Sequence, residues 1–577
     1  MERTAQASNR SAQTTSRAVS EGSICYTTRF RCIRNNLSGS SFDQFGVIQR
    51  NSRSLPLRVL VAVAVLAGVL ANACTIAPAR PGLRQGGTLS VAIDSEPTSL
   101  NPLVAGDLPS IRAYTPLFPL LYSAHTDLSV GPDLASALPT VSASGDVLTV
   151  PLRNDAKWSD GMPITADDVV YTVTTEMNPS LDTRASFNWG PLQSVVKVNA
   201  HTVKFTLAAP DAAYLANHLV FPVVPQHVLG QVNVAEMSQA PYNSAPSVTG
   251  GPFRFNHRVA GQQIVLDAST NYYLGTPHLA HVVEVVTHDP NQVLNHLGSG
   301  QLSWAPVLEP GAAAAAASAA GVALNAYPAT SFVAVMFNVR RGHPFAEHVA
   351  RQAFALSIDH DTTVVQASGS AQGVPVWGDI NPISWAVDSS ALTMYARNPQ
   401  HARNLVDGRH ITTQLIFPVS DPSRASAATL IARQTHDSGF NLTATGLSDQ
   451  AFAAALSGGN FDAAVVAIPT TLDPDDSAVL ASGGGANYGG YTNAALDGLY
   501  GAELSATASA SATLQQVRKP IFSRIERMVT TDLPLYFLWA PRVFTAFNVT
   551  VGGVAGAGAQ LDNDRNETFY RDWYLTG

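Results

Sequence analysis

Residues 152–171 are Leu-Arg-Asn-Asp-Ala-Lys-Trp-Ser-Asp-Gly-Met-Pro-Ile-Thr-Ala-Asp-Asp-Val-Val-Tyr, and they combine a turn with the start of a helix. Asp160 and Gly161 form a dipeptide that is typical of a tight turn, because glycine adopts left-handed backbone angles without a steric penalty. Thr165 precedes a helical pattern, and Asp168 stands at the capping-box position. The segment therefore predicts a turn that ends a strand, followed by a helix that begins at Thr165.

Strand and helix patterns alternate on both sides of this segment. Alternating or continuous apolar runs predict strands at 87–93, 147–152, 201–207, 263–266, 332–338 and 463–468. Helical patterns predict helices at 165–177, 344–357 and 513–530. The alanine run 312–320 predicts a surface helix, because alanine has the highest helix propensity. Since strands and helices alternate without a short repeat, we expect a mixed α/β protein of several lobes.

The composition excludes several classes of protein. The chain has 577 residues, of which 46% are hydrophobic and 13% are charged, so it has ample material for a core and is neither disordered nor a small disulfide-stapled protein. Its net charge of −8 is unevenly distributed, because residues 1–73 hold nine Arg and three acids, and the remainder is therefore acidic. This balance argues against a nucleic-acid partner.

An export signal is predicted near the N-terminus. Val59–Ala71 is a run of 13 residues without a polar side chain, preceded by arginines. Because a membrane-spanning helix needs about 20 apolar residues, the run is better suited to the apolar region of a secretory signal. The small residues that lead into Cys74 resemble the lipobox of bacterial lipoproteins, which implies that Cys74 becomes the lipidated first residue. An ordinary signal peptide and an uncleaved membrane anchor remain the alternatives.

Residues 1–46 fit no export signal, so we expect translation to start near Val47. Residues 1–73 are then a signal peptide with an N-terminal extension, and 74–86 form a lipidated linker. Cleavage would remove the other two cysteines, Cys25 and Cys32. The mature protein would have no disulfide, no thiol nucleophile and no cysteine metal site.

No motif supports an enzyme. The chain lacks the nucleophile elbow Gly-x-Ser-x-Gly, the phosphate-binding P-loop, Gly-x-Gly-x-x-Gly, His-Glu-x-x-His and Cys-x-x-Cys. His278, His281, His288 and His296 are close in sequence, but acidic partners are sparse, which favours exposed histidines over a metal site. We therefore expect a non-enzymatic protein without cofactor or metal.

The segment Leu152–Tyr171 also resembles the signature of family 5 extracellular solute-binding proteins, which are peptide receptors of ABC importers. Further resemblances follow in the family's order over residues 87–577. They include residues 94–102, 224–229, 249–253, 271–277, 344–359, 461–462, 473–475, 491–499 and 533–536. The shared motifs are mostly structural, so the resemblance identifies a scaffold and says little about the ligand.

The resemblance implies an α/β, three-lobed periplasmic-binding-protein-like fold of class II, cluster C. Lobe I would be discontinuous and consist of 87–122, 248–330 and 541–577. Lobe II would be 123–247, and lobe III would be 331–540. In such proteins the ligand lies between lobes I and III, which close on it by a hinge motion.

The resemblance also implies where the ligand's amine would be bound. Dipeptide receptors carry an amine-binding aspartate at the position that corresponds here to Thr470. Because threonine has no charge, the nearest replacements are Asp473, Asp475 and Asp476, whose mutual repulsion a ligand ammonium would relieve. A solvated loop that starts a helix explains the same three residues equally well.

Other candidate ligand residues come from both lobes. Arg409 and Arg424 in lobe III are candidates for binding a ligand carboxylate. Trp377 and Trp385 flank a loop that lines the pocket in the family, where they would stack on the ligand, although both also suit a packed core. From lobe I, the family layout places Asp107, Ser110 and Tyr114 at the cleft.

The resemblance implies a monomeric, lipid-anchored receptor on the extracytoplasmic face of the cell membrane. It would capture di- or oligopeptides and deliver them to the permease subunits of an ABC transporter. Two alternatives remain open: an envelope lipoprotein that binds mannosylated phosphatidylinositol without a transport role, and a receptor for haem or another non-peptide ligand. A hydrolase has no motif behind it.

Replacement of the lipid-bearing cysteine tests the anchor. Cys74→Ala should move the protein from the membrane fraction to the soluble or culture fraction, because the acyl chains would have no attachment point. Cell fractionation and the mass of the mature N-terminal peptide provide the measurement. Unchanged membrane retention together with no acyl mass on Cys74 would contradict the prediction.

Overall fold

The computed structural model describes residues 83–181, 188–306, 308, 310–369, 373–509, 511–554 and 567–576. The predicted signal segment and Cys74 lie outside these residues, so the signal peptide and the lipid anchor stay predictions. Within the described ranges, no helix is both long and apolar enough to cross a bilayer.

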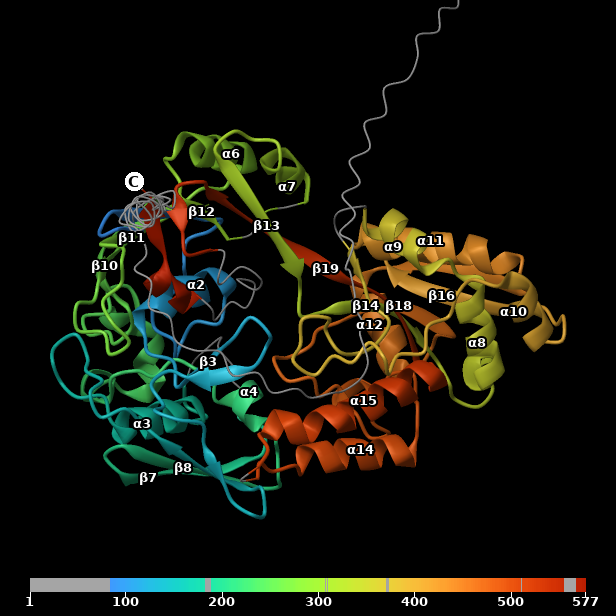
Figure 1. Ribbon diagram of the computed structural model, residues 1–577, viewed down its shortest axis with the longest axis horizontal. Helices are drawn as coiled ribbons and strands as arrows, with labels where there is room; N and C mark the ends of the chain where they lie inside the picture. The colour runs from blue at the N-terminus through green and yellow to red at the C-terminus, as the bar shows by residue number, and fades with distance from the viewer. Residues whose placement is uncertain are drawn as a thin grey trace, which may run out of the picture. The chain divides into compact units, whose positions relative to one another are not determined.

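The largest sheet among the described residues has twelve strands (Figure 1). Its order is β17-β16-β18-β14-β19-β12-β2-β11-β10-β9, with β13 and β15 also paired to β19. The strands are β2 Thr88–Ile93, β9 Phe253–Val259, β10 Gln263–Ala268, β11 His281–Val286, β12 Trp304–Ala305, β13 Val322–Pro328, β14 Phe332–Phe337, β15 Gly373–Pro375, β16 Ile411–Pro418, β17 Phe440–Leu447, β18 Ala463–Ile468 and β19 Leu535–Asn548.

The helices mostly flank these strands. They include α2 Leu108–Tyr114, α3 Ala166–Glu176, α4 Tyr214–His218, α6 Pro290–Ser299, α7 Pro310–Ala316, α8 His348–Ser357, α9 His360–Ser368, α10 Pro399–Leu405, α11 Pro422–His436, α12 Asp449–Gly458, α14 Ala494–Leu504 and α15 Leu514–Asp532. Figure 1 shows α14 and α15 side by side, with helices α8 to α11 grouped together on the other side of β14 and β18.

Strand β14 is covered on both faces, as its continuous apolar sequence predicts. Val333 and Val335 pack into one hydrophobic cluster with residues of α8, α9 and α11. Ala334 and Met336 point the other way, into a second cluster with residues of α14 and α15. Because successive side chains alternate across a strand, β14 forms the middle layer of an α/β/α arrangement in predicted lobe III.

Predicted lobe II is built on a second, antiparallel sheet of order β5-β6-β8-β7. Its strands are β5 Thr140–Val141, β6 Val147–Pro151, β7 Leu192–Asn199 and β8 Thr202–Leu207, and α3 packs against β7 and β8. Val203 and Phe205 of β8 belong to the same hydrophobic cluster as Leu89 and Val91 of β2. Predicted lobes I and II therefore share one core.

The local structure around Trp158 confirms the first prediction. Gly161 has φ +89°, and Thr165 caps α3 in a capping box with Asp168. The side chain of Asp168 also accepts from the backbone of Gln226 at 3.0 Å, so the helix start is tied to a distant segment. A second capping box, formed by Thr513 and Gln516, begins α15.

Two helix predictions need correction. Residues 344–346 form a 3₁₀ turn, and α8 begins only at His348 because the backbone of Glu347 is extended. The alanine helix α7 ends at Ala316, and it is not a simple surface helix, because Ala313 and Ala316 are buried against Phe544 and Ala546 of β19. Small methyl side chains allow this close packing.

Strand β19 connects the predicted lobes I and III. Its first part pairs with β14 through Leu535–Trp539, and its second part pairs with β13 through Arg542–Asn548. At the changeover, the backbone N–H of Ala329 donates to the carbonyl of Pro541 at 2.7 Å. The chain therefore passes between these lobes as two adjacent strands, at the predicted boundaries 330/331 and 540/541.

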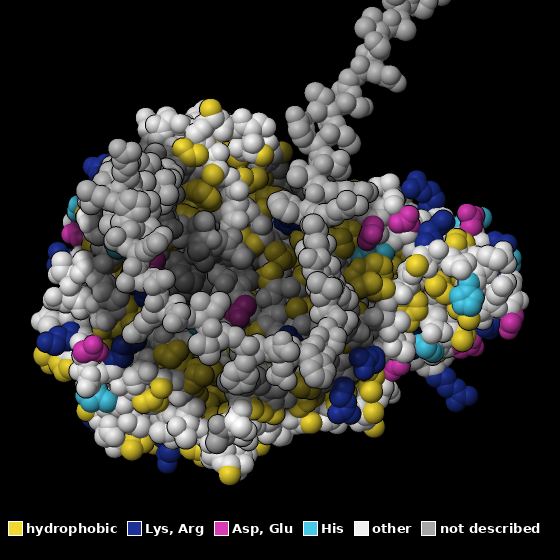
Figure 2. Space-filling view, viewed as in Figure 1, with side chains coloured by type: hydrophobic (Ala, Val, Ile, Leu, Met, Phe, Trp, Pro, Cys, Tyr) yellow, Lys and Arg dark blue, Asp and Glu magenta, His cyan; other side chains and the backbone are white. Residues whose placement is uncertain are grey.

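Positively charged side chains do not gather in one large patch on the visible face. Figure 2 shows Lys and Arg side chains in small separate groups over the face that this view presents. This distribution agrees with the acidic net charge of −8.

Gly251 tests the packing between two distant segments of predicted lobe I, 87–122 and 248–330. A Cβ atom there would lie 2.5 Å from the carbonyl oxygen of Pro116 and 2.8 Å from the backbone nitrogen of Phe118. Gly251→Ala should lower the free energy of unfolding by about 1–3 kcal/mol or more, because backbone atoms cannot move aside cheaply. Gly483→Ala, where a Cβ atom would meet open space, is the matched control. Equal melting temperatures for the two variants would contradict the prediction.

Candidate functional site

A cavity of about 200 Å³ lies at the carboxyl ends of parallel strands in predicted lobe I. Strand β2 pairs in parallel with both β11 and β12, so the residues that follow these strands meet at one edge of the sheet. Those residues are Asp94 after β2, Thr287 and His288 after β11, and Pro306 after β12, and all four line the cavity. This edge is where ligands bind in open α/β sheets.

Helix α2 supplies a basic residue to this cavity. Arg112 lines it and is only 9% exposed. His288 is held in place because its Nδ1 lies 2.5 Å from the carbonyl oxygen of Asp94. Sequence reasoning missed Arg112 and Asp94 and considered His288 only as a possible metal ligand, although the position of Asp94 directly after β2 was a usable signal.

The three residues predicted to face the cleft from lobe I, Asp107, Ser110 and Tyr114, all belong to helix α2 or its N-cap. Asp107 caps α2 by accepting from the backbone of Ser110 at 3.0 Å, and its carboxylate also accepts from the hydroxyl of Thr98. Burial raises the pKa of Asp107, but its hydrogen bonds outweigh burial and the pKa is lowered overall. Tyr114 is 8% exposed and packs in the core. Asp107 and Ser110 therefore position α2, and their contact with a ligand stays a prediction.

Thr470 lies at the corresponding edge of predicted lobe III. Strand β16 pairs in parallel with β17 and β18, and Pro469 and Thr470 directly follow β18. The Thr470 hydroxyl is buried and has no hydrogen-bond partner among the described residues. A buried hydroxyl without a partner is costly, so this position is suited to a ligand group that hydrogen-bonds to it.

Asp473 is engaged within the protein. Its two oxygens accept from Arg518 at 2.6 and 2.7 Å, and Glu503 accepts from the same guanidinium at 2.5 and 2.8 Å. Arg518 is 2% exposed and lies 5.0 Å from the ring centre of Phe522 and 5.9 Å from that of Trp385. This bidentate pair leaves Asp473 poorly placed to receive a ligand ammonium.

The other two aspartates of this loop differ from each other. Asp475 accepts from the backbone and the hydroxyl of Ser477 at 3.0 and 3.1 Å, which stabilises the next helical turn. Asp476 is buried, and its pKa is raised by burial and then by Asp379, Asp475 and Asp473. The structure therefore brings Asp476 together with a carboxyl group, Asp379, that sequence reasoning did not single out.

Asp379 belongs to the loop between Trp377 and Trp385. It is 1% exposed, and no described side chain hydrogen-bonds to either of its oxygens. Burial raises its pKa to about 7. Glu526 of α15 is also buried, and burial followed by Asp379 raises its pKa to about 9. A carboxyl group in this surrounding is favoured in its neutral form.

Both tryptophans are half-buried and already have aromatic partners. Trp377 stacks on His360 with ring centres 3.7 Å apart, and Trp385 packs edge-on against Phe522 at 5.8 Å. The backbone N–H of Trp385 donates to the carbonyl of Asp127 at 2.9 Å, which links predicted lobes II and III. The structure thus supports the packing alternative for both residues, and ligand stacking stays a prediction.

The two arginines proposed for a ligand carboxylate lie at opposite edges of the sheet. Arg424 is in the first turn of α11, which follows the carboxyl end of β16, and it pairs with Asp421 at 2.7 Å. Arg409 precedes β16, at the amino end, and pairs with the exposed Glu347 at 3.0 Å. Only Arg424 shares an edge with Thr470.

Metal ligands are not gathered at this site or elsewhere in the described part of the chain. No group of three or more His, Cys, Asp or Glu side chains there is arranged to hold a metal ion. Of the histidines weighed for metal binding, His278 hydrogen-bonds to Gln85 and His281 pairs with Asp267.

Comparison with known proteins shows what this architecture resembles. Residues 129–490 match the family model of bacterial extracellular solute-binding proteins, family 5 middle. The oligopeptide-binding protein AppA of Bacillus subtilis is 24% identical over 483 residues, which cover 79% of this chain and 87% of AppA.

Solved structures match over most of the chain. The ABC transporter substrate-binding protein CtaP of Listeria monocytogenes has a TM-score of 0.70 at 22% identity, and the match covers 86% of this chain and 100% of CtaP. AppA from Bacillus subtilis in complex with a nonapeptide has a TM-score of 0.60 at 23% identity, with the same coverage. These matches confirm the predicted α/β periplasmic-binding-protein fold.

Asp379 should make stability depend on pH. Because its folded pKa is about 7, above the ordinary 3.8, the folded state holds this proton more tightly and loses stability as pH rises from about 4 to about 7. Asp379→Asn should therefore raise the free energy of unfolding at pH 8 by up to about 4 kcal/mol and change it little near pH 4. Urea unfolding at several pH values measures this.

The exposed Asp437→Asn serves as the control and should leave the pH dependence unchanged. An Asp379→Asn curve that runs parallel to the wild-type curve from pH 4 to pH 8 would contradict the assignment of a buried neutral carboxyl group.

Proposed function

Because this chain belongs to the bacterial extracellular solute-binding proteins of family 5, we propose that it captures di- or oligopeptides and delivers them to the permease of an ABC importer. Members of this family are non-enzymatic substrate-binding proteins of ABC transporters of the peptide and nickel type, and this chain is one of them. The peptide ligand, the lipid anchor at Cys74 and the monomeric state are parts of the proposal.

The observation that carries the proposal is that candidate ligand groups lie at the carboxyl edges of the parallel strands in both predicted lobes. Predicted lobe I has a cavity at the carboxyl ends of β2, β11 and β12, lined by Arg112 and His288. Predicted lobe III has Thr470 at the carboxyl end of β18, with a buried hydroxyl that lacks a described partner. Ligand bound between the two edges would contact residues of both lobes and could hydrogen-bond to the Thr470 hydroxyl.

The chain path supports a hinge between these edges. Two adjacent strands join the lobes, through 329–331 and through 540–542 of β19. A few backbone angles in these segments would be enough to rotate one lobe against the other, as in hinge closure around a ligand. The proposal is therefore that peptide binding draws the two edges together.

Recognition of the peptide's charged ends would be asymmetric. In lobe I, Arg112 supplies a positive charge that suits the carboxylate of a peptide. In lobe III, Asp473 is engaged by Arg518, so the peptide amine would meet the neutral hydroxyl of Thr470 instead of a free carboxylate. We infer that this chain binds peptides with little preference for a free amine.

The same observation supports a second candidate function. A neutral Thr470 in place of the acidic residue of dipeptide receptors also suits a ligand that carries no amine, such as a glycolipid headgroup or haem. Native mass spectrometry of ligand that co-purifies with the mature protein separates the candidates. Peptide masses support the first function, and a glycolipid or porphyrin mass supports the second.

Restoring the missing charge tests the role of Thr470. A carboxylate that pairs with an ammonium in a partly buried cleft contributes about 2–5 kcal/mol. Thr470→Asp should therefore tighten binding of a free-amine peptide by about tenfold or more, and should not tighten binding of the same peptide when N-acetylated. Isothermal titration with a peptide identified by mass spectrometry, free and acetylated, is the measurement.

Thr429→Asp, at an exposed position on α11, is the matched control and should leave both affinities unchanged. A wild-type protein that strongly prefers the free amine, or a Thr470→Asp variant that tightens neither peptide, would show that this position does not face the amine.

A further inference from the structure

A second, larger cavity has a different set of lining residues from the first. It has a volume of about 480 Å³, within the range of about 300–1,000 Å³ that holds small ligands. Its walls come from lining residues within 138–148 and 211–215 of predicted lobe II and from residues 506, 508, 509, 511–514 and 516 of predicted lobe III. None of the residues predicted to bind peptide lines it.

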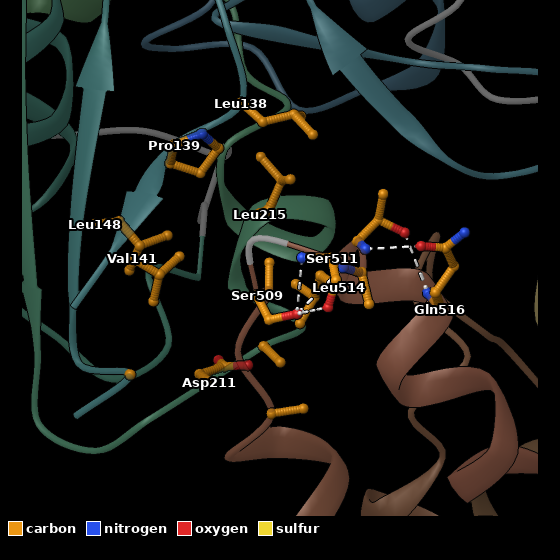
Figure 3. A pocket seen from close by; sticks show the side chains of 16 residues that line it. Leu138, Pro139, Val141, Leu148, Asp211, Leu215, Ser509, Ser511, Leu514 and Gln516 are labelled. Atoms are coloured by element: carbon orange, nitrogen blue, oxygen red, sulfur yellow. Dashed lines mark hydrogen bonds between the residues drawn. The ribbon is translucent and has the colours of Figure 1, made fainter. Parts of the chain in front are cut away.

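The wall of this cavity is mainly aliphatic. Figure 3 shows Leu138 and Pro139 on one side of the space and Leu514 on another, with Leu215 between them. Leu138 is 50% exposed, which is unusual for a leucine that has a core available to it. Contiguous apolar surface that remains accessible to solvent is typical of a binding site.

Several polar groups among the lining residues hydrogen-bond to one another. The hydroxyl of Ser509 accepts from the backbone of Ser511 at 3.3 Å and of Ala512 at 3.1 Å. Thr513 and Gln516 satisfy each other in the capping box of α15. These groups therefore stabilise the shape of the wall, and the surface that the wall presents to a ligand is mainly apolar.

Asp211 is the charged side chain among the lining residues. One of its oxygens accepts from the backbone of Ala213 at 2.9 Å, and no described side chain hydrogen-bonds to its carboxylate. In Figure 3 it lies at the edge of the space opposite Leu138 and Pro139. The cavity therefore has an apolar body and one acidic group, which is the complement of an amphiphile with a single positive charge.

The surroundings of Asp211 have a surplus of negative charge. Burial, followed by the charges of Asp473 and Asp475, raises its pKa to about 6, although the backbone hydrogen bond from Ala213 and the charge of Arg518 lower it. Arg518 is itself shared between Asp473 and Glu503. A ligand cation beside Asp211 would offset this surplus, whereas a ligand anion would add to it.

We propose that this cavity is a second ligand site, which binds a monocationic amphiphile with its protonated amine at Asp211 and its aliphatic body against Leu138, Leu215 and Leu514. The ligand contacts two predicted lobes at once, because the cavity walls come from both. The site does not depend on which molecule the peptide site binds, and it goes beyond the proposed transport function.

Binding of n-octylammonium chloride tests the proposal on the mature protein. Isothermal titration near pH 7.5 should show saturable binding, with n-octanol at least tenfold weaker and octanoate weaker still. Binding should weaken at about pH 5, because protonation of Asp211 removes the negative charge while the amine stays protonated.

Two variants test the charge of Asp211 and the volume of the cavity separately. Asp211→Asn should weaken n-octylammonium by at least tenfold and leave n-octanol unchanged, since only the charge is removed. Ala512→Trp should abolish binding of both probes by filling the cavity. The exposed Asp449→Asn, which is not part of the cavity wall, should change neither.

Three results would overturn the proposal. They are no saturable binding of n-octylammonium by the wild-type protein, equal affinity for n-octylammonium and n-octanol, and binding that neither Asp211→Asn nor Ala512→Trp reduces. Peptide binding by the two variants is measured in parallel, and unchanged peptide affinity would confirm that the second site is separate from the first and that the variants are folded.

Discussion

The hydrogen bonding of strand β19 is the constraint on which the rest of the structure depends. Leu535–Asn548 pairs with β14 in one half of the large sheet and with β13 and β12 in the other. Because β19 belongs to both halves of the sheet, the parallel strands of predicted lobe I and those of predicted lobe III each have a defined carboxyl edge on either side of it. Loops at those edges carry the candidate site, while the chain that joins the halves remains only two strands wide.

A buried arginine provides the second organising interaction. Arg518 of α15 connects Asp473 of the loop after β18 with Glu503 of α14, and its guanidinium also lies 3.5 Å from the carbonyl of Ala212 in predicted lobe II. Removal of one partner from such a buried network typically costs about 3–5 kcal/mol, because the remaining charges lose their compensation. The same network holds the wall of the cavity near Asp211 and occupies both carboxylate oxygens of Asp473.

Carboxyl groups outnumber cations in this region, and this has consequences for function. Asp379, Asp476 and Glu526 are buried with raised pKa values, so they are favoured as neutral hydrogen-bonding groups and not as charges. An acidic sequence motif near a ligand site therefore does not by itself identify a cation-binding residue. Thr470 has no charge, and it is better placed than these carboxyl groups for a hydrogen bond to the proposed ligand.

Local features of this protein were predictable from sequence alone because they depend on neighbours in the chain. The turn at Gly161, the capping box of Thr165 and Asp168, and the buried strands β14 and β18 follow from residue type and spacing. The order of family motifs was also sufficient to predict the fold. The surface position of α7 was mispredicted, since burial of Ala313 against β19 involves residues more than two hundred positions away.

Only the tertiary structure decided which side chains are available to a ligand. Asp473 and Arg518 are 45 positions apart and pair because α15 packs beside the loop after β18, and Arg112 and His288 line the same cavity although they are far apart in sequence. Sequence spacing does not encode such long-range pairings. Charge type and helix periodicity are local properties, whereas burial, pairing and access arise when distant segments pack together.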